Sequence, residues 1–184
     1  MPNDPTLSHT CSWHRRYERE RHARLASEAL AEQGLHDLYN NKQLLELAGS
    51  IAIKANEATT VDDALLFALK RVCEATGWIL GHAYMVTGNP PLLAPTKLWF
   101  GADGEHLREF REITERSWFQ KGRGLAGRVL ETGTPSWLPN VLAHSDIARK
   151  RVAARCGLTA AVAFPILAGT EVAGVLEFFL DQPR

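Results

Sequence analysis

Three closely spaced glycines form the pattern in this chain that comes nearest to a known phosphate-binding motif. Gly122, Gly124 and Gly127 match G-x-G-x-x-G, with which dinucleotide-binding folds hold a pyrophosphate. That use requires a buried strand directly before the glycines, whereas the preceding residues, EITERSWFQK, are charged and helical in character. We therefore expect the glycines to allow a tight entry into a short helix that begins near Leu125. An anion at the N-terminus of that helix stays open as an alternative.

The cysteines and one histidine are the other side chains that could do chemistry. Cys11, Cys73 and Cys156 lie far apart, so they indicate neither a disulfide framework nor a zinc site, and we expect free, mostly buried thiols. His82 lies in an apolar segment, where period-two alternation places it on the same strand face as Tyr84. A lone strand histidine is more typical of a core or a pocket wall than of a metal site, and we predict no metal site.

The N-terminal part of the chain is expected to be helical. Residues 1–12 are polar, contain two prolines and are predicted to be flexible. From 13 to about 56 there is no proline, and Arg, Glu, Ala and Leu predominate, which favours one long helix. Leu38 and Leu45, seven residues apart, are its candidate contacts with a second copy of the chain. Whether the helix continues through Gly34 stays open.

The rest of the chain is predicted to contain both helices and strands. A helix is expected between Thr60, a plausible N-cap, and Gly77, a helix stop. The last two strands flank a tight turn and predict an antiparallel hairpin. The expected strands are 78–86, 92–100, 135–138, 159–167 and 171–180, and the further helices fall within 104–119, near 125 and over 146–156. This order is not the alternation of a parallel α/β fold, so we predict an α+β domain over 51–184, behind a signalling helix over 13–50 that is similar to a coiled coil.

Two segments carry a family resemblance. FQKGRGLAGRVLETGTPSW, residues 119–137, and GLTAAVAFPILAGTEVAGVLEFF, residues 157–179, resemble the signature of GAF domains. The chain looks like the GAF domains of bacterial sensor histidine kinases and diguanylate cyclases, and the resemblance covers about residues 44–182. It implies a six-stranded antiparallel sheet with helices on one face and, on the opposite face, a ligand pocket covered by loops and short helices.

The resemblance also implies a function. GAF domains bind small molecules or dimerise, and they pass a signal along flanking helices, as in two-component systems. We therefore expect a non-catalytic sensory module with no catalytic residues. A ligand-free dimerisation scaffold is one alternative. A methionine sulfoxide reductase of the GAF type is a less favoured one, because it needs two thiols held close together and no local cysteine pair exists.

The resemblance points to aromatic side chains at strand ends and loops, with a few polar groups among them, as the pocket wall. The ligand-pocket candidates are His82, Tyr84, Trp99, Phe119, Arg123, Arg128, Trp137 and Phe164. The ligand is unknown. Covalent bilin attachment is disfavoured, because the thiol of bilin-binding GAF domains is generally followed by histidine and Cys156 is followed by Gly157. Haem, through His82, His106 or His144, and cyclic nucleotides stay open.

Charge and hydropathy limit the kinds of partner that the chain is expected to bind. The formal net charge is zero, so no whole-protein field favours nucleic acid or an anionic membrane surface. No apolar run reaches the ~20 residues that a membrane span needs, and the N-terminus lacks a signal-peptide core, so we expect a cytoplasmic protein. The long N-terminal helix leads us to expect a homodimer that pairs through it. The sequence stops at DQPR, just after the last strand, so the helix that usually leads to an output domain is missing; we expect either a fragment of a longer regulator or a standalone sensor.

Overall fold

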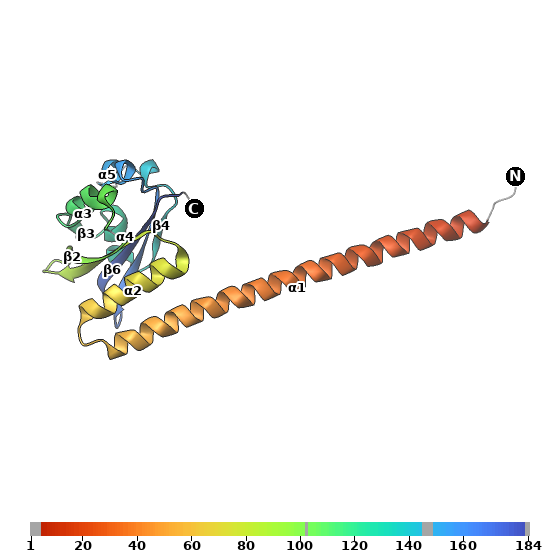
Figure 1. The fold of residues 1–184 in the computed structure, drawn as a ribbon, viewed down its shortest axis with the longest axis horizontal. Coiled ribbons are helices and arrows are strands. Elements are labelled where there is room, and N and C mark those ends of the chain that lie inside the picture. Colours follow the sequence, from red (N-terminus) through yellow and green to blue (C-terminus); the bar gives the residue numbers. More distant parts are fainter. Residues whose placement is uncertain (1–4, 102, 145–148, 183–184) are drawn as a thin grey trace. The chain divides into compact units, whose positions relative to one another are not determined.

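The computed structural model describes the backbone of residues 5–101, 103–144 and 149–182 (Figure 1). The chain consists of two units that meet after Ala48, and one helix runs from the first unit into the second.

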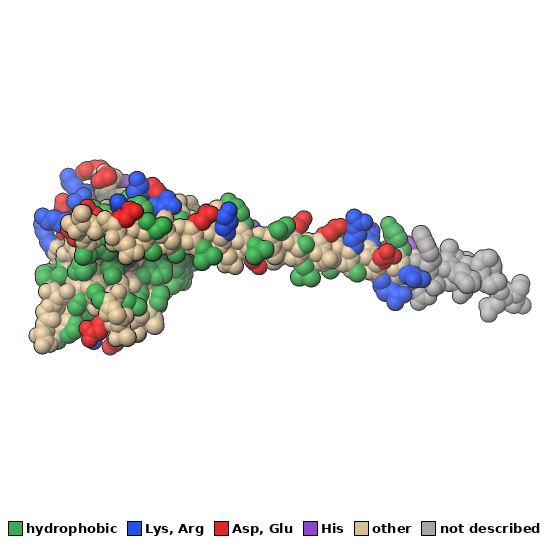
Figure 2. All heavy atoms as spheres, turned by 90° about the horizontal axis from the view of Figure 1, so that it is seen from below, with side chains coloured by type: hydrophobic (Ala, Val, Ile, Leu, Met, Phe, Trp, Pro, Cys, Tyr) green, Lys and Arg blue, Asp and Glu red, His purple; other side chains and the backbone are tan. Residues whose placement is uncertain are grey.

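The first element is the long helix that the sequence predicts. Helix α1 spans Pro5–Glu57, 53 residues, and is continuous through Gly34. It begins at Pro5, inside the segment 1–12, whose flexibility stays a prediction. Its apolar residues are spread around the helix instead of forming one stripe. Figure 2 accordingly shows hydrophobic and charged side chains interspersed along α1. The large apolar residues exposed between 14 and 46 are Tyr17, Leu25, Leu30, Leu35, Leu38, Tyr39, Leu44 and Leu45.

Six antiparallel strands make one sheet in the order β3-β2-β1-β6-β5-β4. The strands are β1 Leu80–Thr87, β2 Leu92–Phe100, β3 Phe119–Gln120, β4 Ser136–Leu138, β5 Ala160–Ala168 and β6 Glu171–Leu180. The predicted six-stranded antiparallel α+β fold behind a long helix is therefore confirmed. Strand β3 was not expected, since two residues carry no periodicity and only their pairing with Leu92 and Leu93 makes them a strand.

One face of the sheet is covered by helix α2, Val61–Thr76. The Thr60 hydroxyl accepts a hydrogen bond from the Asp63 amide, and Gly77 ends the helix in the left-handed conformation, as predicted. Leu65 and Leu69 pack with Ala83 of β1 and Phe178 of β6 in one core. This core holds α2 on the sheet.

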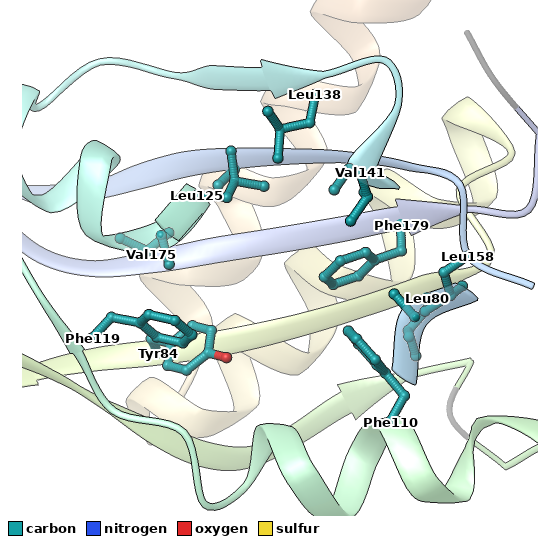
Figure 3. Packing of buried hydrophobic residues seen from close by; sticks show 14 of the residues in the cluster. Leu80, Tyr84, Phe110, Phe119, Leu125, Leu138, Val141, Leu158, Val175 and Phe179 are labelled. Carbon is teal, nitrogen blue, oxygen red and sulfur yellow. The ribbon is translucent and has the colours of Figure 1, made fainter. Parts of the chain in front are cut away.

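Short helices cover the opposite face. They are η1 Glu105–Leu107, α3 Arg108–Thr114, α4 Gly124–Thr132, η2 Val141–Ala143 and α5 Lys150–Arg155. Helix α5 is shorter than the predicted 146–156, of which 146–148 lie outside the described residues. Figure 3 draws 14 residues of this second core, whose side chains come from β1, β6, α3, α4 and the segments around them. The short helices and the sheet thus enclose the space in which the candidate site lies.

Candidate ligand-binding site

A buried ion pair joins the short helices to the sheet. Arg149, directly before α5, donates from Nη2 to both carboxylate oxygens of Glu177 on β6, at 2.9 and 2.8 Å. Its Nη1 donates to the Thr114 hydroxyl at the end of α3, at 2.8 Å. Arg149 is only 5% exposed and Glu177 only 1%. Burial alone would lower the pKa of Arg149, but the Glu177 carboxylate beside it raises that pKa, so the guanidinium stays charged.

Aromatic rings surround the guanidinium. Its central carbon lies 5.1 Å from the ring centre of Phe119, 5.2 Å from Phe110, 5.8 Å from Phe179 and 6.0 Å from Tyr84. Distances of this size allow cation–π attraction, which is strongest where water is excluded. The four rings come from β3, α3, β6 and β1, so the cation holds together elements that are far apart in the sequence.

A small cavity lies beside the pair. The space open to the centre of a water molecule is about 10 Å³, enough for about one water. The described wall is mainly apolar, and its charged side chains are Arg149 and Glu177. The lining residues are Phe110, Phe119, Gly124, Leu125, Leu138, Val141, Arg149, Ala153, Ala161, Glu177 and Phe179. Figure 3 shows many of these side chains converging above the sheet.

Two polar side chains on this face of the sheet are buried with unused hydrogen-bonding atoms. Among the described residues, neither the Tyr84 hydroxyl nor His82 Nδ1 has a hydrogen-bond partner, and both side chains are fully buried. The other ring nitrogen of His82, Nε2, lies 3.0 Å from the Thr96 carbonyl oxygen. Burial lowers the pKa of His82 to about 3, and the hydrogen bond with the Thr96 carbonyl opposes this only in part. Burial raises the pKa of Tyr84. His82 is therefore neutral, which makes Nε2 the donor and Nδ1 a free acceptor.

Several candidate residues lie on the same face as this site. Phe119 lines the cavity, and the His82 ring contacts Tyr84 at 4.5 Å and Trp99 at 4.0 Å between ring centres. Trp99 donates from Nε1 to Glu115 at 3.0 Å, which fixes its ring against the core. The alternation that put His82 and Tyr84 on one strand face is confirmed. His82, Tyr84 and Trp99 do not line the cavity itself; they form the layer next to it.

Two other candidates lie away from the cavity. Trp137 packs edge-on against Trp78 at 5.2 Å, and Phe164 against Phe178 at 6.2 Å, in or beside the core under α2. Both are partly exposed, and neither lines the cavity. Their neighbours Leu138 and Ala163 point to the cavity face instead. Because side chains alternate along a strand, a difference of one residue decides the face.

The two candidate arginines lie on or beside α4. Arg123 is the residue before the helix and is exposed, and Arg128 is partly buried within it. Neither lines the cavity. The glycines around them behave as predicted: Gly122 and Gly124 have φ of 74° and 66°, in the left-handed region, and allow the tight turn into α4.

The ion pair was missed in the sequence. Glu177 carried a signal, because a lone carboxylate inside the apolar run VLEFFL indicates a buried and therefore paired charge. Arg149 carried none, since its partner is 28 residues away and the next two residues, Lys150 and Arg151, are basic as well. Phe110 was not among the pocket candidates, although it lines the cavity.

The two described cysteines lie on opposite faces of the sheet. Cys73 on α2 belongs to the core under that helix, and Cys156 after α5 belongs to the core around the cavity. Both are buried free thiols, as expected. Burial raises the pKa of Cys73 to about 12, so its thiol is unreactive at neutral pH. The side chain of Cys11 lies outside the described residues.

Comparison with protein families agrees with this architecture. The model of the family described as GAF domain matches residues 58–184, more than half of the chain. The chain belongs to the GAF domain family. GAF domains are typically modules that bind small molecules or regulate other activities. No curated protein sequence matches the chain.

Solved structures show the same fold. The A. aeolicus nlh2 GAF domain in an inactive state is 24% identical with a TM-score of 0.59, over 76% of this chain and 80% of that one. The GAF domain of a phosphoenolpyruvate-protein phosphotransferase from Coxiella burnetii is 18% identical with a TM-score of 0.61, over 79% and 82%. The free methionine-R-sulfoxide reductase of Neisseria meningitidis, in complex with its substrate, is 18% identical with a TM-score of 0.55, over 76% and 72%. At these identities the likeness concerns the fold alone.

Metal clusters and membrane spans are both absent from the part of the chain that the structure describes. Those residues contain no group of three or more His, Cys, Asp or Glu side chains placed to hold a metal ion. Within the same residues, no helix is both long enough and apolar enough to cross a membrane.

Proposed function

We propose that this chain is a non-catalytic sensory GAF module of a cytoplasmic signalling protein, and that it binds a small molecule in the cavity at Arg149 and Glu177. The observation that supports this most is the buried ion pair in the wall of an aromatic-lined cavity, next to the Tyr84 hydroxyl, which has no hydrogen-bond partner among the described residues. Ligand sites combine a largely apolar wall with a few convergent polar groups in this way.

The walls of the cavity connect it to several elements of the domain. Glu177 pairs in the sheet with His82 of β1 and Ala163 of β5, while Arg149 bonds to α3 and directly precedes α5. A ligand that altered the pair would therefore act on the sheet and on two helices together. Such coupling requires that the ligand bind one arrangement of these elements more tightly than another.

Neighbouring residues on β5 offer a matched test of ligand binding. Ala161 lines the cavity, whereas Ala160 faces the core under α2, and both are fully or almost fully buried. Ala161→Leu adds three carbon atoms, more than the cavity holds, and Ala160→Leu adds the same volume on the other face. We expect members of a metabolite library to raise the melting temperature of the wild type and of Ala160→Leu but not of Ala161→Leu. A library that stabilises none of the three proteins, or all three equally, would refute this site.

We further propose that the chain is a homodimer that pairs through α1, as in sensor histidine kinases and diguanylate cyclases. The supporting observation is that every described side chain of α1 between 16 and 46 is exposed, including eight large apolar ones. An isolated helix gains little stability without tertiary packing, and a partner helix would supply that packing. Sedimentation velocity of the whole chain tests this: a dimer is expected, and a monomer at all concentrations would refute it.

A further inference from the structure

The charges on the described part of the cavity wall cancel. Among the residues that the structure describes, Arg149 and Glu177 are the charged side chains that line the cavity; they are in direct contact, and both are almost fully buried. A ligand with a net charge would therefore place an uncompensated charge in a site that excludes water, which is costly. The N-terminus of α4 also reaches the cavity at Gly124 and Leu125. It supplies a partial charge of roughly one half, which is too little to offset a whole negative charge.

One group beside the wall is still short of a partner. The Tyr84 hydroxyl is fully buried and without a hydrogen-bond partner among the described residues. In Figure 3 its oxygen points away from Phe119, toward the side on which Phe110 and Phe179 lie. A buried hydroxyl left unpaired is unfavourable, and an acceptor oxygen on a ligand would satisfy it.

We infer that the cavity, once its wall moves to admit a ligand, selects a small uncharged molecule whose acceptor oxygen reaches Tyr84 in the layer next to the lining, and that neutralisation of Arg149 by Glu177 sets this preference. This inference rests on the proposed function. The volume open beside the pair holds about one water, so a ligand of even a few heavy atoms binds only when the wall moves.

Three probes of equal size separate charge from shape. Acetamide, acetate and acetamidine have the same number of heavy atoms but are neutral, anionic and cationic. Each is titrated into ¹⁵N-labelled full-length protein at constant ionic strength, and binding is read from the amide signals of Gly124 and Leu125. We expect wild-type protein to bind acetamide at least about tenfold more tightly than either charged probe, with weak absolute affinities because the probes are small.

Changing the charge of the wall should change the preference. Glu177→Gln keeps the side-chain shape and leaves Arg149 uncompensated, so acetate should become the preferred probe. Arg149→Ala leaves Glu177 uncompensated and opens space among the four rings, so acetamidine should become preferred. Tyr84→Phe should weaken acetamide binding without creating a preference for either ion. If Arg149→Ala does not fold, the near-isosteric Glu177→Gln variant still decides the question.

The failures are distinguishable. Wild-type protein that binds acetate or acetamidine as tightly as acetamide, or a Glu177→Gln variant that keeps the neutral preference, overturns the inference and leaves the proposed site standing. Absence of binding by all three probes to every folded variant also overturns it. The proposed function then fails as well only if the metabolite library gives no stabilisation that depends on Ala161.

Discussion

Nη2 of Arg149 lies 2.9 and 2.8 Å from the two carboxylate oxygens of Glu177, and four aromatic rings surround the guanidinium. The pair connects α5 to the central strand β6 across 28 residues of sequence. Such a pair costs desolvation energy, so its presence is weak evidence for stability by itself. Its consequences are nevertheless specific enough to measure.

Breaking the pair on one side should be more harmful than removing it altogether. Arg149→Met or Glu177→Leu alone leaves a buried charge without a partner and should lower the free energy of unfolding by about 3–5 kcal/mol. The double variant should lose much less stability, because both charges are gone and the four rings then surround apolar side chains. Urea unfolding followed by tryptophan fluorescence measures all three. Glu109→Gln, which breaks the exposed contact with Arg155, is the control and should change stability little. Strictly additive single and double effects would contradict this account.

His82 should make the fold sensitive to acid. Its pKa is about 3 in the folded protein, while the unfolded chain has the ordinary value of 6.5, so between these limits the unfolded state binds one more proton. Stability contributed by the neutral ring is present above pH 6.5 and is lost as the pH falls. Between pH 7 and pH 5 the wild type should lose about 2 kcal/mol more than His82→Gln. Parallel pH profiles for the two proteins would show that the imidazole is not held neutral.

Glycines at two positions should respond oppositely to alanine. A Cβ at Gly127 would lie 2.3 Å from the Gln120 carbonyl oxygen, so Gly127→Ala forces α4 away from β3 and should cost about 1–3 kcal/mol in urea unfolding. At Gly34, in the middle of α1, a Cβ meets nothing within 4 Å. Gly34→Ala should stabilise that stretch of helix by about 1 kcal/mol, seen as slower amide hydrogen exchange around residue 34. Unchanged exchange would contradict a helix that is continuous at this point.

Leu38 and Leu45 should matter to dimerisation if α1 pairs through their side of the helix. Both are exposed and lie about two turns apart. Lysine at both positions should shift the protein toward monomer in sedimentation velocity, by placing like charges at the contact. His36 and Gln43 also lie seven residues apart but roughly on the opposite side of the helix. Lysine at both of these positions is the control and should leave the oligomeric state unchanged. An equal effect of the two double variants would contradict pairing through Leu38 and Leu45.

The elements with local signals were predictable from the sequence. Thr60 and Gly77 mark the ends of α2 because capping depends on neighbouring residues, and the bounds of β6 follow from its apolar run and the turn before it. Strand β3 was not predictable, since its two residues become a strand only through pairing with β2.

The site was predictable only in part. Period-two alternation places His82 and Tyr84 on the correct face of β1, because both lie in one strand whose face the pattern shows. Alternation shows which residues of a strand share a face, but the pairing of that strand in the sheet decides which face points to the cavity. Trp137 and Phe164 were assigned to the pocket wall without knowledge of that pairing. The Arg149–Glu177 pair is a tertiary contact, so the sequence shows that Glu177 needs a partner but does not show which residue supplies it.

The central claim is that the cavity at Arg149 and Glu177 holds a small ligand. Native mass spectrometry tests it most directly, on gently purified full-length protein equilibrated with a metabolite extract, with Ala161→Leu and Ala160→Leu prepared alongside. The account predicts a discrete extra mass on the wild type and on Ala160→Leu that is absent from Ala161→Leu. A wild type without bound mass, or an Ala161→Leu variant that keeps the same mass, would contradict it.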